Sequence, residues 1–175
     1  VRDGEGTVHI LVDSGVMRVE GKSSGVLISW DLPGWVRGSL RVETPGGSIE
    51  LKVGEQTFIP LKEGNVTLRM RDAAGNEIEV PIRVERLSVS LSPLGEVEVE
   101  GDGQLTFEVN GRSYSGPARV DAGWFPVYRV RVYNYGVLIG EYLGYSVKPI
   151  VPLLIIALIP ILMRIRGRET EQAPE

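Results

Sequence analysis

Hydrophobic and polar residues alternate with a period of two along much of the chain before residue 145. The clearest run lies between residues 76 and 86, where Ile78, Val80, Ile82 and Val84 alternate with charged residues and Pro81. Such alternation predicts a strand with one buried face and one solvent-facing side. Because proline cannot donate to a ladder, we expect this strand at the edge of a sheet.

A second alternating run lies just upstream. Val66, Leu68 and Met70 alternate with polar residues, and residues 72–75 (DAAG) separate the two runs. Asp, Asn and Gly are typical turn residues because they tolerate the backbone angles that a reversal requires. The sequence therefore predicts a β-hairpin at this point.

Shorter runs of the same kind precede this hairpin, and Gly and Pro punctuate them at short intervals. No window between residues 7 and 145 keeps apolar residues at helical spacing. Short, evenly spaced strands are typical of a β-sandwich, which we expect over residues 1–87. The other runs lie at residues 7–12, 16–20, 25–30, 38–43, 48–53 and 56–59.

A second β unit is expected over residues 88–145. Alternating runs lie at residues 96–100, 105–109 and 128–132, and Asn110-Gly111 is a strong two-residue hairpin turn. About 58 residues is small for a free-standing sandwich, so we expect this unit to pack on the first unit, on a bilayer or on a partner.

Two segments of the first unit carry a family resemblance. GVLISWDLP (residues 25–33) and LKEGNVTLRMRDAAGNE (residues 61–77) resemble a fibronectin type III domain, and the AGN hairpin also occurs in immunoglobulin-like repeats. The resemblance implies that Trp30 is a core residue, that Leu61 lies at a turn, and that Val66, Leu68 and Met70 face inward. The chain lacks the tyrosine that the family usually has after this turn.

An apolar run near the C-terminus predicts a membrane span. Residues 142–163 hold a single charge, at Lys148, and 22 residues of helix cover roughly 33 Å. We therefore expect a transmembrane helix over residues 146–166 and a tail over 167–175; the alternative is a buried core helix. Three arginines follow the run, so the positive-inside rule puts the tail in the cytoplasm and the β units outside.

An exterior location requires an export signal, and none is evident near Val1. We expect either a removed signal peptide or a longer precursor. Asn65-Val66-Thr67 is a glycosylation sequon, and it would suit an exterior β unit.

Composition excludes several kinds of chemistry. The 175 residues include no Cys and one His, and the net charge is −4. A disulfide framework and thiol catalysis are excluded, and a His-based metal cluster is disfavoured. The excess of acidic over basic residues argues against nucleic-acid binding. We expect no catalytic, cofactor or metal site, because the Ser residues have no base at motif spacing.

Two groups of residues are candidates for binding. Glu96, Glu98 and Glu100 share a strand face; they predict either a cation site or, preferably, a solvated face paired with Arg129 and Arg131. Three aromatic residues in glycine-containing loops are candidate partner contacts, because loop positions are often exposed. These residues are Trp35, Trp124 and Phe125.

The expected protein is therefore all-β, with two β-sandwich-like units followed by one C-terminal transmembrane α-helix. Its expected role is non-catalytic: a structural, adhesive or accessory subunit of a cell-surface assembly, with a protein partner and the lipid bilayer as its contacts. Two alternatives stay open, a carbohydrate- or ligand-binding receptor module and the anchored C-terminal part of a secreted enzyme.

Overall fold

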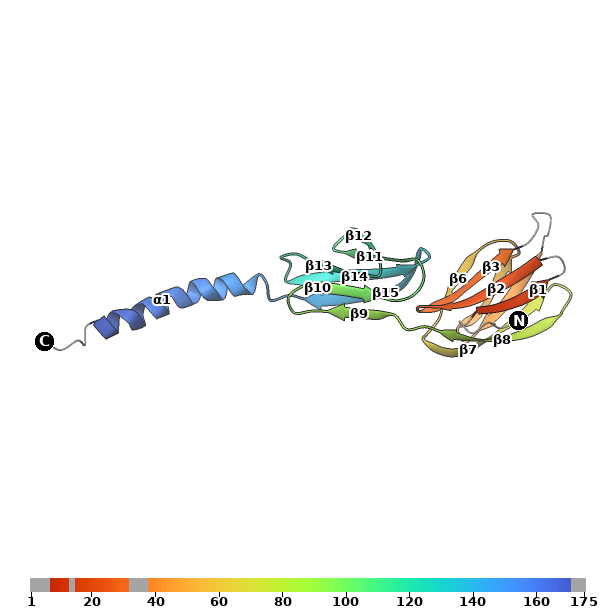
Figure 1. Ribbon diagram of the computed structural model, residues 1–175, viewed down its shortest axis with the longest axis horizontal. Helices are drawn as coiled ribbons and strands as arrows, with labels where there is room; N and C mark the ends of the chain where they lie inside the picture. The colour runs from red at the N-terminus through yellow and green to blue at the C-terminus, as the bar shows by residue number, and fades with distance from the viewer. Residues whose placement is uncertain (1–6, 13–14, 32–37, 171–175) are drawn as a thin grey trace.

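The computed structural model describes residues 7–12, 15–31 and 38–170. In this part of the chain, two β units follow one another along the long axis of the molecule, and a helix extends from the far end of the second (Figure 1). We call strands β1–β8 the first unit and strands β9–β15 the second unit. The all-β prediction for the region before residue 146 is confirmed.

The first unit consists of two antiparallel four-stranded sheets, with the strand orders β1-β2-β3-β6 and β5-β4-β7-β8. A single hydrophobic core contains buried side chains from both sheets, as in a β-sandwich. Leu68 and Met70 of β7 and Val26 and Ile28 of β3 are almost fully buried there. The strands are β1 (Thr7–Val12), β2 (Gly15–Lys22), β3 (Gly25–Asp31), β4 (Ser39–Thr44), β5 (Gly47–Lys52), β6 (Thr57–Pro60), β7 (Gly64–Asp72) and β8 (Glu77–Val84).

The predicted hairpin is confirmed. Strands β7 and β8 pair antiparallel, and Asp72 closes the turn by accepting hydrogen bonds from the backbone and side chain of Asn76 at 2.8 and 2.6 Å. Pro81 lies on β8, which is an outer strand of its sheet as expected. Val80 is buried, whereas Ile78, near the turn, is 43% exposed.

The second unit has a three-stranded sheet, β13-β10-β9, and a four-stranded sheet, β12-β11-β14-β15. Its separate core includes Val97 and Val99 from the first sheet and Phe107 and Tyr128 from the second. The strands are β9 (Ser88–Leu91), β10 (Glu96–Glu100), β11 (Leu105–Val109), β12 (Arg112–Ser115), β13 (Ala118–Asp121), β14 (Val127–Asn134) and β15 (Val137–Tyr145).

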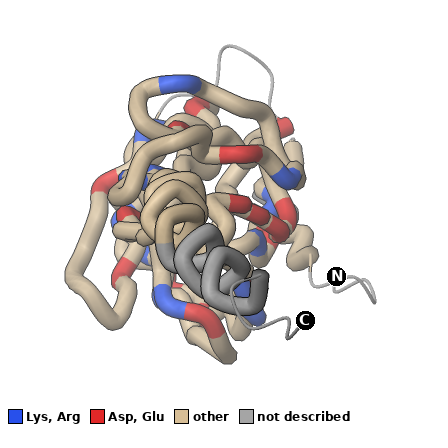
Figure 2. Tube along the Cα trace, turned by 90° about the vertical axis from the view of Figure 1, so that its left-hand side faces the viewer, with Lys and Arg blue, Asp and Glu red and all other residues tan. Residues whose placement is uncertain are grey.

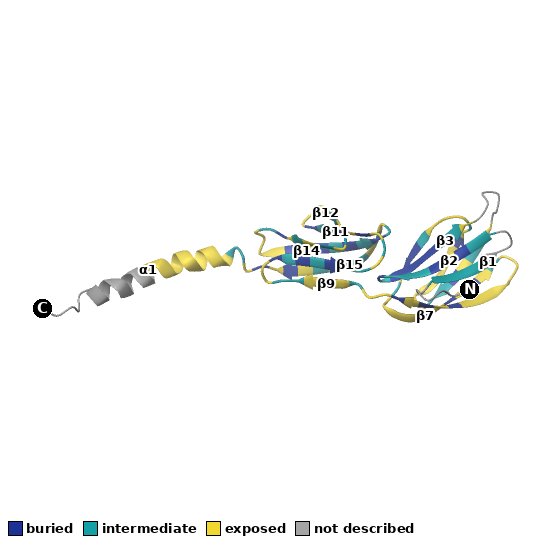
Figure 3. Ribbon diagram, in the orientation of Figure 1, coloured by how far each residue is buried: buried dark blue, intermediate teal, exposed yellow. Residues whose placement is uncertain are grey.

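A helix, α1 (Ile150–Thr170), follows β15. Its first part is exposed and extends away from the second unit (Figure 3). In the described part of the chain, no helix is both long enough and apolar enough to span a membrane.

The predicted transmembrane helix over residues 146–166 is therefore wrong, and so is the single-pass location with the β units outside and residues 167–175 in the cytoplasm. The apolar run was counted from Tyr142, but β15 continues to Tyr145 and the helix begins only at Ile150.

Candidate interaction surfaces

The turn between β2 and β3 reaches from the first unit into the second. It consists of Ser23 and Ser24, and Ser24 adopts a left-handed conformation with φ of 59°. Ser23 also forms a parallel bridge to Glu85, at the end of the first unit, and is fully buried. The hairpin turn is therefore held against residues 85–87, the connecting segment between β8 and β9.

Ser23 is bonded to the loop between β10 and β11. Its N–H donates to the carbonyl of Asp102 at 3.2 Å, and its Oγ accepts from the Asp102 N–H at 2.6 Å. The same Oγ donates to the carbonyl of Arg86 at 3.1 Å, in the connecting segment. One serine therefore satisfies backbone groups on both sides of the boundary between the units.

Asn134 completes this network from the end of β14. Its Nδ2 donates to the carbonyls of Ser23 and Asp102 at 3.0 and 3.1 Å, and its side chain is fully buried. A buried amide that bonds backbone on two segments fixes their separation, because each unpaired group there would cost desolvation energy. We call Ser23, Asp102 and Asn134 the joint.

Two glycines permit the close approach at the joint. A Cβ added at Gly101 would collide with the Ser23 side chain, and one added at Gly103 would collide with the amide of Asn134. Gly103 also has φ of +116°, which side-chain-bearing residues rarely adopt. The sequence signal that could have indicated this joint is Gly-Asp-Gly at residues 101–103.

Charge and ring contacts border the joint. Lys22 Nζ lies 3.0 Å from a Glu20 carboxylate and 3.3 Å from that of Asp102. Burial lowers the pKa of Lys22, but hydrogen bonds and charge interactions with the two carboxylates together raise it above the usual value. Phe58 of the first unit stacks on Tyr135 of the second, with ring centroids 5.6 Å apart.

The far end of the second unit exposes aromatic residues. Trp124 and Phe125, both predicted partner contacts, are 66% and 55% exposed. The Gly123 N–H donates to Asp121 Oδ1 at 2.8 Å, and Gly123 has φ of 82°, so the loop turns tightly before it reaches Trp124. The hydrogen bond from Lys148, followed by that from Gly123, holds the pKa of Asp121 below its usual value. The loop is thereby attached to the segment that leads into α1.

Other exposed apolar side chains lie on neighbouring strands. Val127 and Tyr145 are paired across β14 and β15, and they are 50% and 69% exposed. Leu143 is also exposed. Tyr128, the residue after Val127, is instead buried, and its hydroxyl donates to the Ser92 carbonyl at 3.2 Å. Together with Trp124 and Phe125, we call Val127, Leu143 and Tyr145 the apolar end.

The remaining predicted residues lie in different places. Trp30 is half-buried against the first core and borders a cavity of about 520 Å³. Leu61, the predicted turn residue, also packs against that core. Asn65 is exposed on β7, where its accessibility is compatible with modification. Trp35 lies outside the described residues.

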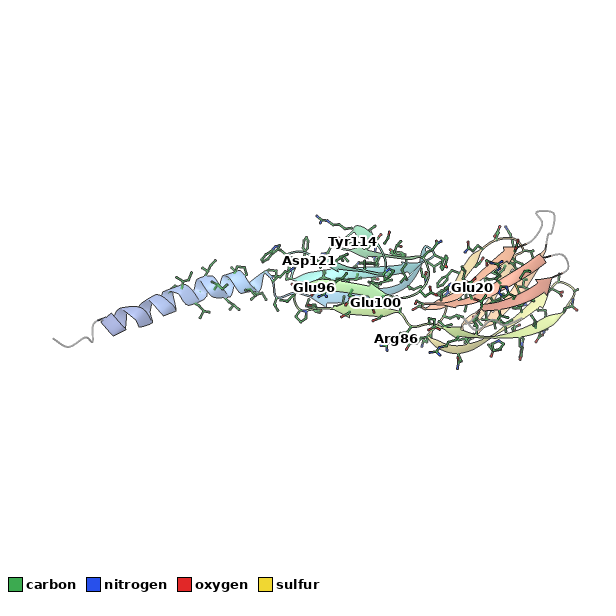
Figure 4. All side chains as sticks on the ribbon, viewed as in Figure 1. Glu20, Arg86, Glu96, Glu100, Tyr114 and Asp121 are labelled. Atoms are coloured by element: carbon green, nitrogen blue, oxygen red, sulfur yellow. The ribbon has the colours of Figure 1, made fainter. Side chains whose placement is uncertain are left out.

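The expected partners of the acidic strand were wrong. Arg119 on β13 pairs with Glu96 and lies opposite Glu98, whereas Arg129 and Arg131 belong to the other sheet and bind Glu141. Period-two alternation places side chains on a face but contains no information about which strand is the neighbour. Figure 4 shows Glu96 near Asp121 and Glu100 farther toward Arg86.

No protein-family model matches the chain, and no curated protein matches it either.

Proposed function

We propose that this chain is a non-catalytic structural subunit of a protein assembly, in which the joint holds two β units end to end. The observation that carries the proposal is the hydrogen-bond network of Ser23, Asp102 and Asn134, whose members are contributed by both units. A tandem pair whose boundary is held by these directional hydrogen bonds acts as a spacer of defined length. The apolar end is then the surface that the spacer presents to its partner.

A protein is the partner that this surface favours. Aromatic residues are enriched in protein interfaces, because each buries a large area at a small cost in side-chain entropy. Acidic and basic positions are interspersed over the view of Figure 2, which gives no extended basic face for a nucleic acid. For the first unit we propose a fibronectin III or immunoglobulin-like relationship, supported by the two-sheet core and the packing of Trp30 and Leu61.

Spin labels in the two units test the joint. The chain has no cysteine, so Glu50→Cys on β5 and Arg112→Cys on β12 supply two unique labelling sites on exposed strands. A single narrow distance distribution is expected in the otherwise unchanged chain, and a broader one when Asn134→Ala is added. A broad distribution in both proteins contradicts the spacer proposal.

Substitutions at the apolar end test partner binding. The double substitution of Trp124→Ser with Phe125→Ser removes two exposed aromatic side chains. When the assembly is isolated from the source cells through a tag on this chain, the double variant should no longer bring down the stoichiometric partner. The matched control is Ile49→Ser, an exposed apolar side chain on the first unit. Equal recovery of the partner by all three proteins contradicts the proposed role of the apolar end.

A carbohydrate-binding module is the second candidate, favoured by the exposure of Trp124, Phe125 and Tyr145. Aromatic faces stack on sugar rings, so oligosaccharide binding should quench indole fluorescence. The difference between the unchanged chain and Trp124→Phe isolates the Trp124 signal from that of the other tryptophans. Quenching that disappears in Trp124→Phe supports this candidate over the spacer.

A further inference from the structure

An outer strand of a sheet exposes unpaired N–H and C=O groups, and proteins usually protect such edges with short strands, proline or lysine. Most outer strands here have one of these features. Strands β9, β12 and β13 have four residues each, β8 contains Pro81, β6 ends at Pro60 and β5 ends at Lys52. Strand β15 has nine residues and is the longest of the outer strands in the described sheets.

Strand β15 contains neither proline nor a basic residue. Its pairing with β14 shifts by one residue at Val132 and Tyr133, which leaves Ile139 as an extra residue in a bulge. After the bulge, Gly140–Tyr145 pair regularly with Val127–Val132. In the described chain β15 pairs with β14 alone, so the six regularly paired residues Gly140–Tyr145 lie along an open edge of the sheet.

The two faces of this edge differ. Tyr142 packs against the second core and Gly144 is buried against the Tyr128 ring, so these residues point inward. Leu143 and Tyr145, which alternate with them, are 57% and 69% exposed on the outer face. An added strand would cover this apolar stripe as well as satisfy the backbone.

The charged side chains on the outer face indicate which residues a strand added at this edge would contain. On the outer face, Glu108 of β11 lies opposite Arg131 of β14, and Arg131 lies opposite Glu141 of β15. Arg129 and Arg131 bind the Glu141 carboxylate at 3.2 and 3.4 Å. The side chains across β11, β14 and β15 are therefore acidic, basic and acidic in turn, and this row ends at the open edge of β15. A basic residue at the next position continues the alternation, whereas an acidic one would face Glu141 directly.

We propose that β15 binds an extended segment of a partner protein as an added strand, with Lys or Arg opposite Glu141 and apolar residues opposite Leu143 and Tyr145. Main-chain hydrogen bonds supply affinity in this mode of recognition, and the alternate side chains supply specificity. The inference deepens the proposed function, on which it rests for the nature of the partner. A second copy that pairs through its own β15 fits less well, because β15 contains no basic residue and no β15–β15 register puts a cation opposite Glu141.

Peptides provide the probe. A nine-residue peptide of alternating Val and Thr with a central Lys should bind the full chain, and amide resonances should shift at Gly140–Tyr145. The same peptide with a central Glu should bind roughly three- to fivefold more weakly, which is the scale of a cross-strand charge pair. Equal affinity of the two peptides, or shifts confined to another strand, would overturn the proposal.

A matched pair of variants identifies the edge. Leu143→Lys adds a charge to the exposed face of β15 and should abolish binding of the Lys peptide. Thr106→Lys adds the same charge at the exposed position of β11, an interior strand of the same sheet, and should leave binding within twofold. A concentration-dependent dimer of the unchanged chain, lost in Leu143→Lys, would assign β15 to a second copy and overturn the proposal. Trp124→Ser should still bind the peptide, because Trp124 lies outside β15, so loss of the Trp124 contact is distinguishable from failure of this edge.

Discussion

Asn134 and Ser23 lie 111 residues apart in sequence, and the side-chain amide of the first donates to the carbonyl of the second at 3.0 Å. Both residues are fully buried, at the boundary between two units that have separate hydrophobic cores. The contact between the units at this point is therefore polar and directional rather than a continuation of either core. Polar contacts of this kind specify one relative placement, because they lose their geometry when either unit turns.

Asn134→Ala should destabilise the chain by about 2 kcal/mol, because two hydrogen bonds of about 1 kcal/mol each are lost, although the Asp102 carbonyl still accepts from the Ser23 N–H. Denaturant unfolding followed by tryptophan fluorescence measures this change. The control is Asn65→Ala, at an exposed position of β7, which should change the free energy of unfolding by less than about 0.5 kcal/mol. Similar losses in the two variants would contradict a stabilising joint.

Gly103→Ala should be more destabilising than Gly54→Ala. Both glycines have positive φ, of +116° and +96°, so both substitutions impose backbone strain of about 1 to 2 kcal/mol. A Cβ at Gly54 meets nothing within 4 Å, whereas one at Gly103 collides with the Asn134 amide. Thermal unfolding of the two variants separates strain from collision, and an equal loss in melting temperature would show that the approach at Gly103 is not close.

Trp30→Ala should cost about 3 kcal/mol, the lower end of the range for large aromatics, because the side chain is half-buried against the first core. Trp124→Ala should cost less than about 0.5 kcal/mol, since Trp124 is 66% exposed. Chemical denaturation followed by circular dichroism compares the two. Small effects at both positions would show that the Trp30 side chain is not packed against the first core.

Acid should weaken the β7–β8 hairpin. The side-chain hydrogen bond from Asn76 is the largest effect that holds the pKa of Asp72 below its usual value. A lowered pKa in the folded state means that this stabilisation is present above the unfolded value of about 3.9 and is lost as pH falls through the folded value. Carbon NMR of the Asp72 carboxyl, titrated from pH 6 to 2, measures the folded pKa directly.

Asn76→Ala is the matched variant for that titration. It removes the side-chain donor, so the pKa of Asp72 should rise toward its usual value and the melting temperature should depend less on pH in the acid range. Titration of Asp72 at the ordinary pKa in the unchanged chain would show that the turn hydrogen bonds do not persist in solution.

Much of the strand content could be predicted from local pattern. The run at residues 25–30 became β3 (Gly25–Asp31), and the run at 48–53 became β5 (Gly47–Lys52) within one residue at each end. Asn110-Gly111 formed the predicted hairpin turn, with φ of 50° and 82°. Alternation and turn chemistry are properties of neighbouring residues, so they can be read without knowledge of the fold.

Tertiary structure decided which strands became neighbours and where the last strand ended. Glu96 is paired with Arg119 rather than with Arg129, because β13 and β14 belong to different sheets. The residues at 142–145 were included in the apolar run that predicted a membrane span, but pairing with β14 holds them in β15. The joint was missed because Ser23 and Asn134 are unremarkable in their own segments.

The sequence by itself determined the β architecture and the hairpins. These depend on local backbone preference and on the period with which side chains alternate between two faces. Only the tertiary structure decided the contact of Ser23 with Asn134 and the open edge of β15. Both depend on backbone groups brought together from distant segments, and a backbone N–H or C=O is the same in every residue except proline, so the sequence does not mark which of them remain unpaired or find a distant partner.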